Sequence, residues 1–156
     1  MITIVSGGQT GADRAALDFA IAVGAPYGGF VPRARMTEDG PLPLKYLGMS
    51  ETTGFRNVER TELNVIHSDA TLIVTNGELA GGSKVTRAFA RKHRKPVLHL
   101  DLALVSPADA AAKARVWLTA ARCKTLNVAG PRASKQPSSY RDTFELLKLI
   151  FEELDF

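Results

Sequence analysis

The sequence predicts an α/β fold in which helices cover a mostly parallel sheet of about five strands, and three observations predict this class. Short apolar runs alternate with longer stretches of helical periodicity, as in β-α-β units with right-handed crossovers. The run Thr71–Val74 is almost continuously apolar, which indicates a strand buried on both faces. A glycine-rich turn joins the first strand to the first helix. With 156 residues and no repeat or linker, one domain over residues 1–156 is expected.

The individual elements follow from periodicity and from residues that begin or end helices. Ala15, Phe19 and Val23 recur at helical spacing and form one apolar face. Pro107 stands at the start of the fourth helix, where its missing N–H costs nothing, and Ser106 precedes it as the N-cap. The predicted strands are Ile2–Val5, Tyr27–Val31, Ala70–Val74, Val97–Leu100 and Thr125–Val128. The predicted helices are Ala12–Val23, Arg56–His67, Ser83–His93, Ala108–Ala121 and Tyr140–Leu154.

Composition favours a globular protein of the cytoplasm. Hydrophobic residues make up 45% of the chain, which is ordinary for a soluble domain. No apolar run approaches the roughly 20 residues needed to cross a bilayer, and no signal-peptide pattern stands at the N-terminus. Cys123 is the single cysteine, which excludes an internal disulfide and suits a reducing compartment. We therefore expect a cytoplasmic protein without a membrane partner.

The net charge of +4 is compatible with nucleic-acid binding, but the placement of the basic residues argues against such a partner. The densest basic cluster stands at the end of the third predicted helix, where cations complement the helix dipole. Aromatic residues make up 7% of the chain and do not interleave with the basic ones, as stacking platforms for bases would require. A small anionic ligand is the expected partner. The cluster consists of Arg87, Arg91, Lys92, Arg94 and Lys95.

Two glycines end the first strand and a third opens the first helix. Glycine lacks a Cβ, so such a turn can adopt positive φ and bring backbone N–H groups close to a ligand. At a helix N-terminus these groups favour negative charge. The spacing is neither that of a P-loop nor Gly-x-Gly-x-x-Gly, and a plain connecting turn is the alternative. The predicted phosphate-binding residues here are Gly7, Gly8, Gln9, Thr10 and Gly11, followed by Asp13 and Arg14.

Ligands of parallel α/β sheets bind beyond the carboxyl ends of the strands, and three further loops at such ends carry suitable residues. Each offers glycine, basic or hydroxyl groups, so we expect the loops to converge on one edge of the sheet and bind a phosphate-bearing ligand. The candidates are Arg33, Arg35, Glu38 and Asp39 after the second strand, Gly81, Gly82, Ser83 and Thr86 after the third, and Arg132 and Lys135 after the last.

Several of these residues also have a purely structural interpretation. Asp13 stabilises the start of a helix whether or not it contacts a ligand. Glu38 and Asp39 supply an acid/base or metal-binding carboxylate, or form an ordinary Asp-Gly turn. Arg60 and Asn64 lie four residues apart on a helix face that points into the crevice or to solvent. The sequence contains no persuasive nucleophile and no paired histidine spacing, so neither a catalytic residue nor a metal ligand is predicted.

Six segments, in order over nearly the whole chain, resemble one known family. They are Ser6–Asp18, Glu38–Gly40, Arg60-Thr61 with Asn64-Val65, Ser68–Ile73, Gly81-Gly82-Ser83 with Thr86, and Ala129–Arg132. These motifs are similar to those of the molybdenum cofactor carrier proteins, a branch of the Rossmann-like superfamily that also holds the lysine-decarboxylase-like phosphoribohydrolases and DNA-processing protein A. The resemblance implies a Rossmann-like three-layer α/β/α sandwich.

The same resemblance implies a homo-oligomeric carrier, a dimer or tetramer. Its cargo would be the molybdenum cofactor (molybdopterin), a pterin with a terminal phosphate and a dithiolene-bound metal, or a molybdate-type oxyanion. The sequence departs from the family at Gly29–Pro32, where Gly-Trp-Cys-Pro is expected. Loss of that cysteine leaves oxygen and nitrogen donors, which favours phosphate binding over direct coordination of the metal.

Two alternatives remain open at this point, a nucleotide sensor and a nucleoside monophosphate phosphoribohydrolase. In the phosphoribohydrolases the glycine loop reads Pro-Gly-Gly-x-Gly-Thr-x-x-Glu and its glutamate serves catalysis. Aligned on Gly81 and Gly82, this chain has Val85 in place of the threonine and Ala88 in place of the glutamate. The missing carboxylate favours a binding or carrier protein over an enzyme. If the ligand of this protein is not the molybdenum cofactor, it is expected to be an unknown phosphate-bearing molecule.

Overall fold

A six-stranded parallel sheet forms the middle layer of the structure, a computed structural model that describes residues 1–152. The strands lie in the order β5-β2-β1-β8-β6-β7, so the last strand in the sequence is inserted between the first and β6. This places the loops that follow β1, β8 and β6 next to one another at one edge. The strands are β1 (Thr3–Val5), β2 (Tyr27–Val31), β5 (Met49–Glu51), β6 (Ala70–Thr75), β7 (Val97–Asp101) and β8 (Thr125–Ala129).

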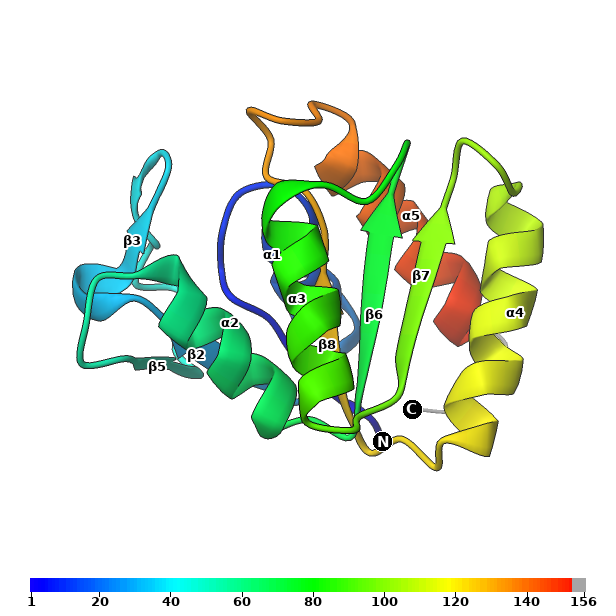
Figure 1. The fold of residues 1–156 in the computed structure, drawn as a ribbon, viewed down its shortest axis with the longest axis horizontal. Coiled ribbons are helices and arrows are strands. Elements are labelled where there is room, and N and C mark those ends of the chain that lie inside the picture. The colour runs from blue at the N-terminus through cyan, green and yellow to red at the C-terminus, as the bar shows by residue number, and fades with distance from the viewer. Residues whose placement is uncertain (153–156) are drawn as a thin grey trace.

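Helices cover both faces of this sheet (Figure 1). One face carries α1, α4 and α5, in which α5 contacts both of the others, and the opposite face carries α2 and α3. Within residues 1–152, none of the helices is long and apolar enough to cross a bilayer. The helices are α1 (Ala12–Val23), α2 (Asn57–Ile66), α3 (Gly81–Lys92), α4 (Pro107–Ala120) and α5 (Ser139–Glu152).

The main hydrophobic core lies between the sheet and α1, α4 and α5. Phe19 of α1 stacks on Phe151 of α5 with 5.7 Å between ring centroids and meets Phe144 edge-on at 6.0 Å. Alternate side chains of the central strands point the other way, toward α2 and α3, and here Thr71 and Asn127 are buried polar groups. The sheet therefore has an apolar face and a partly polar one. The strand residues of the core are Ile4, Ala70, Leu72, Val74, Leu100, Leu126 and Val128.

The predicted Rossmann-like α/β sandwich is confirmed, and each predicted strand and helix is present, with every bound that falls in the described residues within two residues of the prediction. Ser106 caps α4 as expected, since its side chain accepts a hydrogen bond from the N–H of Asp109 at 3.2 Å. The predicted end of the last helix, at Leu154, lies outside the described residues. The sheet has one strand more than the expected five, because β5 is a short, largely exposed edge strand without apolar alternation.

A small antiparallel hairpin, also absent from the sequence prediction, follows β2. It pairs β3 (Met36–Thr37) with β4 (Gly40–Pro41) and projects from the side of the sheet in Figure 1. Glu38 and Asp39 form its turn, and Gly40 follows with a φ of 104°. The segment thus has the Asp-Gly turn conformation that was the structural alternative in the sequence.

Gly11 shows why the first loop needs glycine. It has a φ of 80°, and a Cβ there would lie 2.3 Å from the carbonyl oxygen of Pro131. The same carbonyl accepts a hydrogen bond from the N–H of Ala12 at 3.3 Å, so the loop after β8 is held against the start of α1. A side chain at Gly11 would push these two loops apart.

We expect Gly11→Ala to destabilise the fold by about 3 kcal/mol or more, since it combines a positive φ with a backbone clash. Gly24→Ala is the matched control, because Gly24 has a φ of 71° but open space where a Cβ would lie. It should cost only about 1 kcal/mol. Urea denaturation of both variants measures the difference, and equal losses would show that the contact with Pro131 is unimportant.

Candidate functional site

A cavity of about 530 Å³ lies at the carboxyl edge of the sheet, on the side covered by α2 and α3. Its walls come from the loops after β1, β6 and β8 together with one face of α2. The loop after β2, which the sequence placed in the same group, lies outside it. Of the predicted residues, those that line the cavity are Gly7, Gln9, Asp13, Gly81, Gly82, Ser83, Thr86, Arg132 and Lys135.

Three N–H groups of the first glycine loop already have hydrogen-bond acceptors within the protein. The N–H of Gly8 donates to Ser6 Oγ at 3.4 Å, that of Gln9 to Asp13 Oδ2 at 3.4 Å, and that of Thr10 to Gln9 Oε1 at 3.1 Å. A carboxylate of the chain therefore takes the position at which a phosphate was expected. Gly8, Thr10 and Gly11 do not line the cavity. The loop acts mainly as a support for the residues around it.

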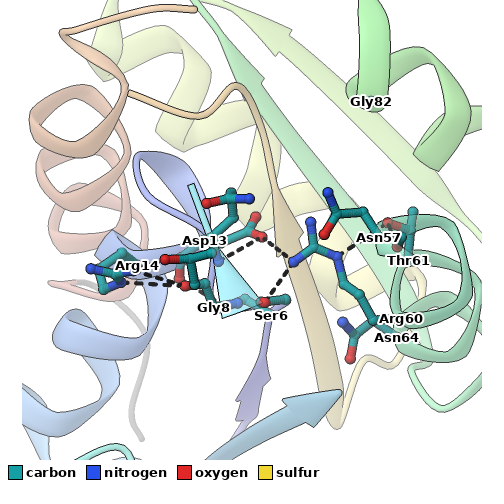
Figure 2. A network of polar contacts seen from close by, with 12 residues as sticks. Ser6, Gly8, Asp13, Arg14, Asn57, Arg60, Thr61, Asn64 and Gly82 are labelled. Carbon is teal, nitrogen blue, oxygen red and sulfur yellow. Dashed lines mark hydrogen bonds and ion pairs between the residues drawn. The ribbon is translucent and has the colours of Figure 1, made fainter. Parts of the chain in front are cut away.

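Beneath this loop, Asp13 and Arg60 form a buried pair (Figure 2). Arg60 Nη1 donates to the carbonyl oxygen of Gly7 at 2.6 Å and lies 3.6 Å from Asp13 Oδ2. Burial raises the pKa of the Asp13 carboxyl, although the charge of Arg60 opposes this shift. Burial likewise lowers the pKa of Arg60, and the charge of Asp13 opposes it. The pair brings a desolvated guanidinium to the cavity wall.

The N-terminus of α3 opens on the same cavity. Its N-cap, Ala80, has no capping side chain, and the first turn contains no acidic residue. Among the residues that the structure describes, the N–H groups of Gly81 and Gly82 have no acceptor, and nothing lies within 4 Å of the position of a Cβ at either. Ser83 is buried, and its hydroxyl group makes no hydrogen bond within residues 1–152. These exposed donors and the helix dipole favour an anion.

Three of the predicted basic residues, Arg14, Arg33 and Arg35, lie outside the cavity lining. Arg14 approaches the first loop from the side opposite Arg60 (Figure 2), donates to the carbonyl oxygen of Gly8 at 3.2 Å and pairs with Asp39 at 3.3 Å. Arg35 donates to three main-chain carbonyls of residues 42–46. Arg33 lies over the ring of Phe55 at 5.3 Å. Their charges serve local packing.

Glu38 ties the hairpin to the loop after β8. Its carboxylate accepts hydrogen bonds from the hydroxyl of Thr10, from the N–H of Ser134 at 3.1 Å and from the Ser134 hydroxyl, and Arg132 Nε lies 4.0 Å away. The hydroxyl groups of Ser134 and Thr10 lower the pKa of Glu38. These contacts occupy the carboxylate with internal partners.

The cavity also contains residues that the sequence prediction omitted or left open. Arg60 and Asn64 are both buried and belong to the lining, so their helix face is turned to the cavity and away from solvent. Val58, Asn76 and Val85 also line the cavity. Asn127 could have been found, since a carboxamide between apolar neighbours in a buried strand is unusual. The other positions depend on how α2 packs against the sheet.

Within residues 1–152, no group of three or more histidine, cysteine, aspartate or glutamate side chains could hold a metal ion. Burial raises the pKa of Cys123 to about 11, and this residue packs in the main core on the other face of the sheet.

Comparison with known proteins agrees with the fold and the motifs. Residues 4–151 match the model of the circularly permutated YpsA SLOG family. The chain is similar to the crystal structure of a "putative molybdenum carrier protein" from Syntrophus aciditrophicus SB, with 47% sequence identity and a TM-score of 0.94. The similarity covers 96% of this chain and 94% of that one. A search of curated proteins finds no match. The resemblance predicted from the motifs is confirmed.

The contacts of Glu38 predict a pH-dependent contribution to stability. Because its pKa lies below the ordinary 4.5 in the folded protein, the carboxylate stabilises the fold at neutral pH, and this is lost as the pH falls through the folded pKa. Glu38→Gln should cost about 1 kcal/mol near pH 7, a modest value because water screens the site. The difference from wild type should vanish in acid.

Thermal denaturation from neutral to acidic pH measures this effect. Glu145→Gln is the control, since the ion pair of Glu145 with Lys148 is exposed and should contribute little at any pH. A wild-type advantage over Glu38→Gln that persists at low pH would contradict the assignment.

Proposed function

This chain belongs to the circularly permutated YpsA SLOG family, and on that premise we propose that it is a carrier that binds a molybdenum-containing anion. The proposed cargo is one of two anions. It is either the molybdenum cofactor (molybdopterin), which is a pterin with a terminal phosphate, or a molybdate-type oxyanion. The name of the 47% identical structure supports the molybdenum-related role. The protein is proposed to hold this cargo for another protein, without transforming it.

The observation that carries the proposal is the uncapped N-terminus of α3. The N–H groups of Gly81 and Gly82 lie at the positive end of the helix dipole and border the cavity, with the hydroxyl of Ser83 beside them. Backbone N–H groups at a helix N-terminus bind phosphate and similar oxyanions without the help of a charged side chain. The second glycine loop is therefore the proposed anion site.

Positive side chains around the cavity support an anionic cargo. Arg60 lies in the wall contributed by α2, and Arg132 and Lys135 follow β8 on the other side. The charge of Arg132 contributes to lowering the pKa of Arg60, which reflects their proximity. A dianion between such groups would relieve their mutual repulsion.

The size of the cavity suits a cofactor as well as an ion. Small-molecule sites generally occupy about 300–1,000 Å³, and the 530 Å³ of this cavity lies within that range. The position of the superfamily's catalytic glutamate is taken by Ala88, which is exposed and outside the lining. Both features favour storage of an organic anion over cleavage of a glycosidic bond.

We also propose that the carrier acts as a homo-oligomer in the cytoplasm. The single, buried thiol is compatible with a reducing compartment. Leu44 and Leu47 are 79% and 84% exposed on the loop before β5, and such side chains are favourable contacts between subunits. Analytical ultracentrifugation distinguishes a dimer or tetramer from a monomer, and a monomer at all concentrations would refute this part.

The anion site is tested by Gly82→Asp. A carboxylate in the first turn of α3 would interact with the helix dipole and repel an incoming anion, while the open space around Gly82 accepts the side chain. We expect the affinity for molybdate, tungstate, inorganic phosphate and the isolated cofactor to fall at least about tenfold by calorimetry, with no loss of stability.

Gly82→Ala is the matched control, because it adds the Cβ without the charge and should bind anions like the wild type. If wild-type protein binds none of the four compounds, the carrier proposal fails. If Gly82→Asp binds as tightly as Gly82→Ala, the anion lies elsewhere. Saturable binding of a nucleotide alone would indicate the nucleotide-sensor alternative.

A further inference from the structure

Every asparagine and glutamine of this protein is among the residues that line the cavity at the carboxyl edge of the sheet. The lining comprises 24 of the 156 residues, yet it contains all of the asparagines and glutamines in the sequence. Carboxamides carry a donor and an acceptor side by side and have no charge. Their concentration points to recognition of an uncharged polar group, in addition to the anion. The six residues are Gln9, Asn57, Asn64, Asn76, Asn127 and Gln136, and the carboxamide of Asn64 is already engaged with the main chain of Phe30.

Asn127 is the least expected of these side chains. It lies in the middle of β8, a central strand, between Leu126 and Val128 of the hydrophobic core. It is 3% exposed, and its Nδ2 donates to Thr71 Oγ1 at 3.2 Å. Its Oδ1 has no hydrogen-bond partner among the described residues, and Asn127 is one of the residues that line the cavity. A buried polar group costs stability unless it is satisfied, so this position is costly without a ligand.

The neighbouring carboxamides are oriented by their own contacts. Gln9 Oε1 accepts from the N–H of Glu38 at 2.9 Å, and Gln136 Oε1 accepts from the N–H of Asn76 at 3.0 Å. Each glutamine therefore has its oxygen engaged, and its NH₂ group has no partner within residues 1–152. The cavity thus combines an acceptor at Asn127 with donors from the two glutamines.

Apolar surface from two helices completes this part of the cavity. Val58 of α2 and Val85 of α3 both line it, and they are 40% and 37% exposed. Side chains of this kind pack against the faces of a flat ring, while carboxamides contact its edge. A bare oxyanion would use neither.

We propose that Asn127 is a specificity-determining residue that recognises the edge of a lactam ring, where an N–H donor lies next to a carbonyl acceptor. This inference rests on the proposed anion site at α3 and deepens it, because it makes the cargo a phosphorylated lactam heterocycle in preference to molybdate. Pterins and guanine share this edge. A site that pairs with such an edge discriminates strongly against ligands that lack it, since its own buried groups are then left unpaired.

Calorimetry with four probes tests the inference. The probes are inorganic phosphate, ribose 5-phosphate, GMP and 6-hydroxymethylpterin phosphate. At least one of the two lactam compounds should bind wild-type protein about tenfold or more tightly than ribose 5-phosphate does. The compound that binds more tightly identifies the source of the ring, a pterin or a purine nucleotide.

Asn127→Leu should abolish this preference and leave the affinity for inorganic phosphate unchanged, because leucine keeps the size of the side chain and removes the carboxamide. Asn127→Thr, which suits a β-strand, is the second variant if leucine impairs folding. Thr143→Val is the control, since Thr143 is a buried polar residue of α5 whose hydroxyl has no partner among the described residues and does not line the cavity.

The outcomes separate this inference from the proposed function. Phosphate binding without any gain from the lactam ring overturns the role of Asn127 and leaves the anion site standing. A preference that survives in both Asn127 variants also overturns it. Failure of wild-type protein to bind every probe, together with molybdate, overturns both proposals.

Discussion

The contact of Arg60 with the first loop is the interaction on which the site depends. One guanidinium joins α2 to the carbonyl of Gly7 and to the carboxylate of Asp13. A Cβ at Gly7 would lie 2.4 Å from the Arg60 Nη1, so the loop and the side chain fit only with glycine there. Four residues further along α2, Asn64 exchanges two hydrogen bonds with the main chain of Phe30 in β2. Together these contacts fix one wall of the cavity against the sheet.

The two glycine loops have different physical roles because their surroundings differ. In the first, Asp13 supplies a carboxylate to the loop and the backbone donors are engaged by side chains. In the second, the start of α3 has no side-chain cap and no acidic residue in its first turn, and the N–H groups of Gly81 and Gly82 have no acceptor among the described residues. A helix N-terminus that the protein leaves uncapped costs stability unless a ligand or water satisfies it. The first glycine loop therefore stabilises the fold, and the second, at a different place on the cavity, is left to bind the ligand.

Much of the fold could be predicted from local pattern. Apolar runs identified the five longer strands, and helical periodicity with Ser106 and Pro107 identified the helices. The edge strand β5 and the hairpin at Glu38 and Asp39 could not be predicted in this way. Their stability comes from pairing with β2 and from contacts with residues such as Ser134, which lie far away in the sequence.

The sequence by itself determined the alternation of strands and helices, the family motifs and the glycine positions, because these depend on short-range periodicity and backbone freedom. Only the tertiary structure decided which charged residues reach the cavity. Arg33, Arg35 and Glu38 looked as suitable as Arg132, but their partners are main-chain carbonyls, a ring and hydroxyl groups brought close by folding. The strand order brought Asn127 to the cavity on which the start of α3 opens, since β8 is inserted between β1 and β6. The sequence determines which charged and polar side chains the protein has, whereas the topology determines which group each of them contacts.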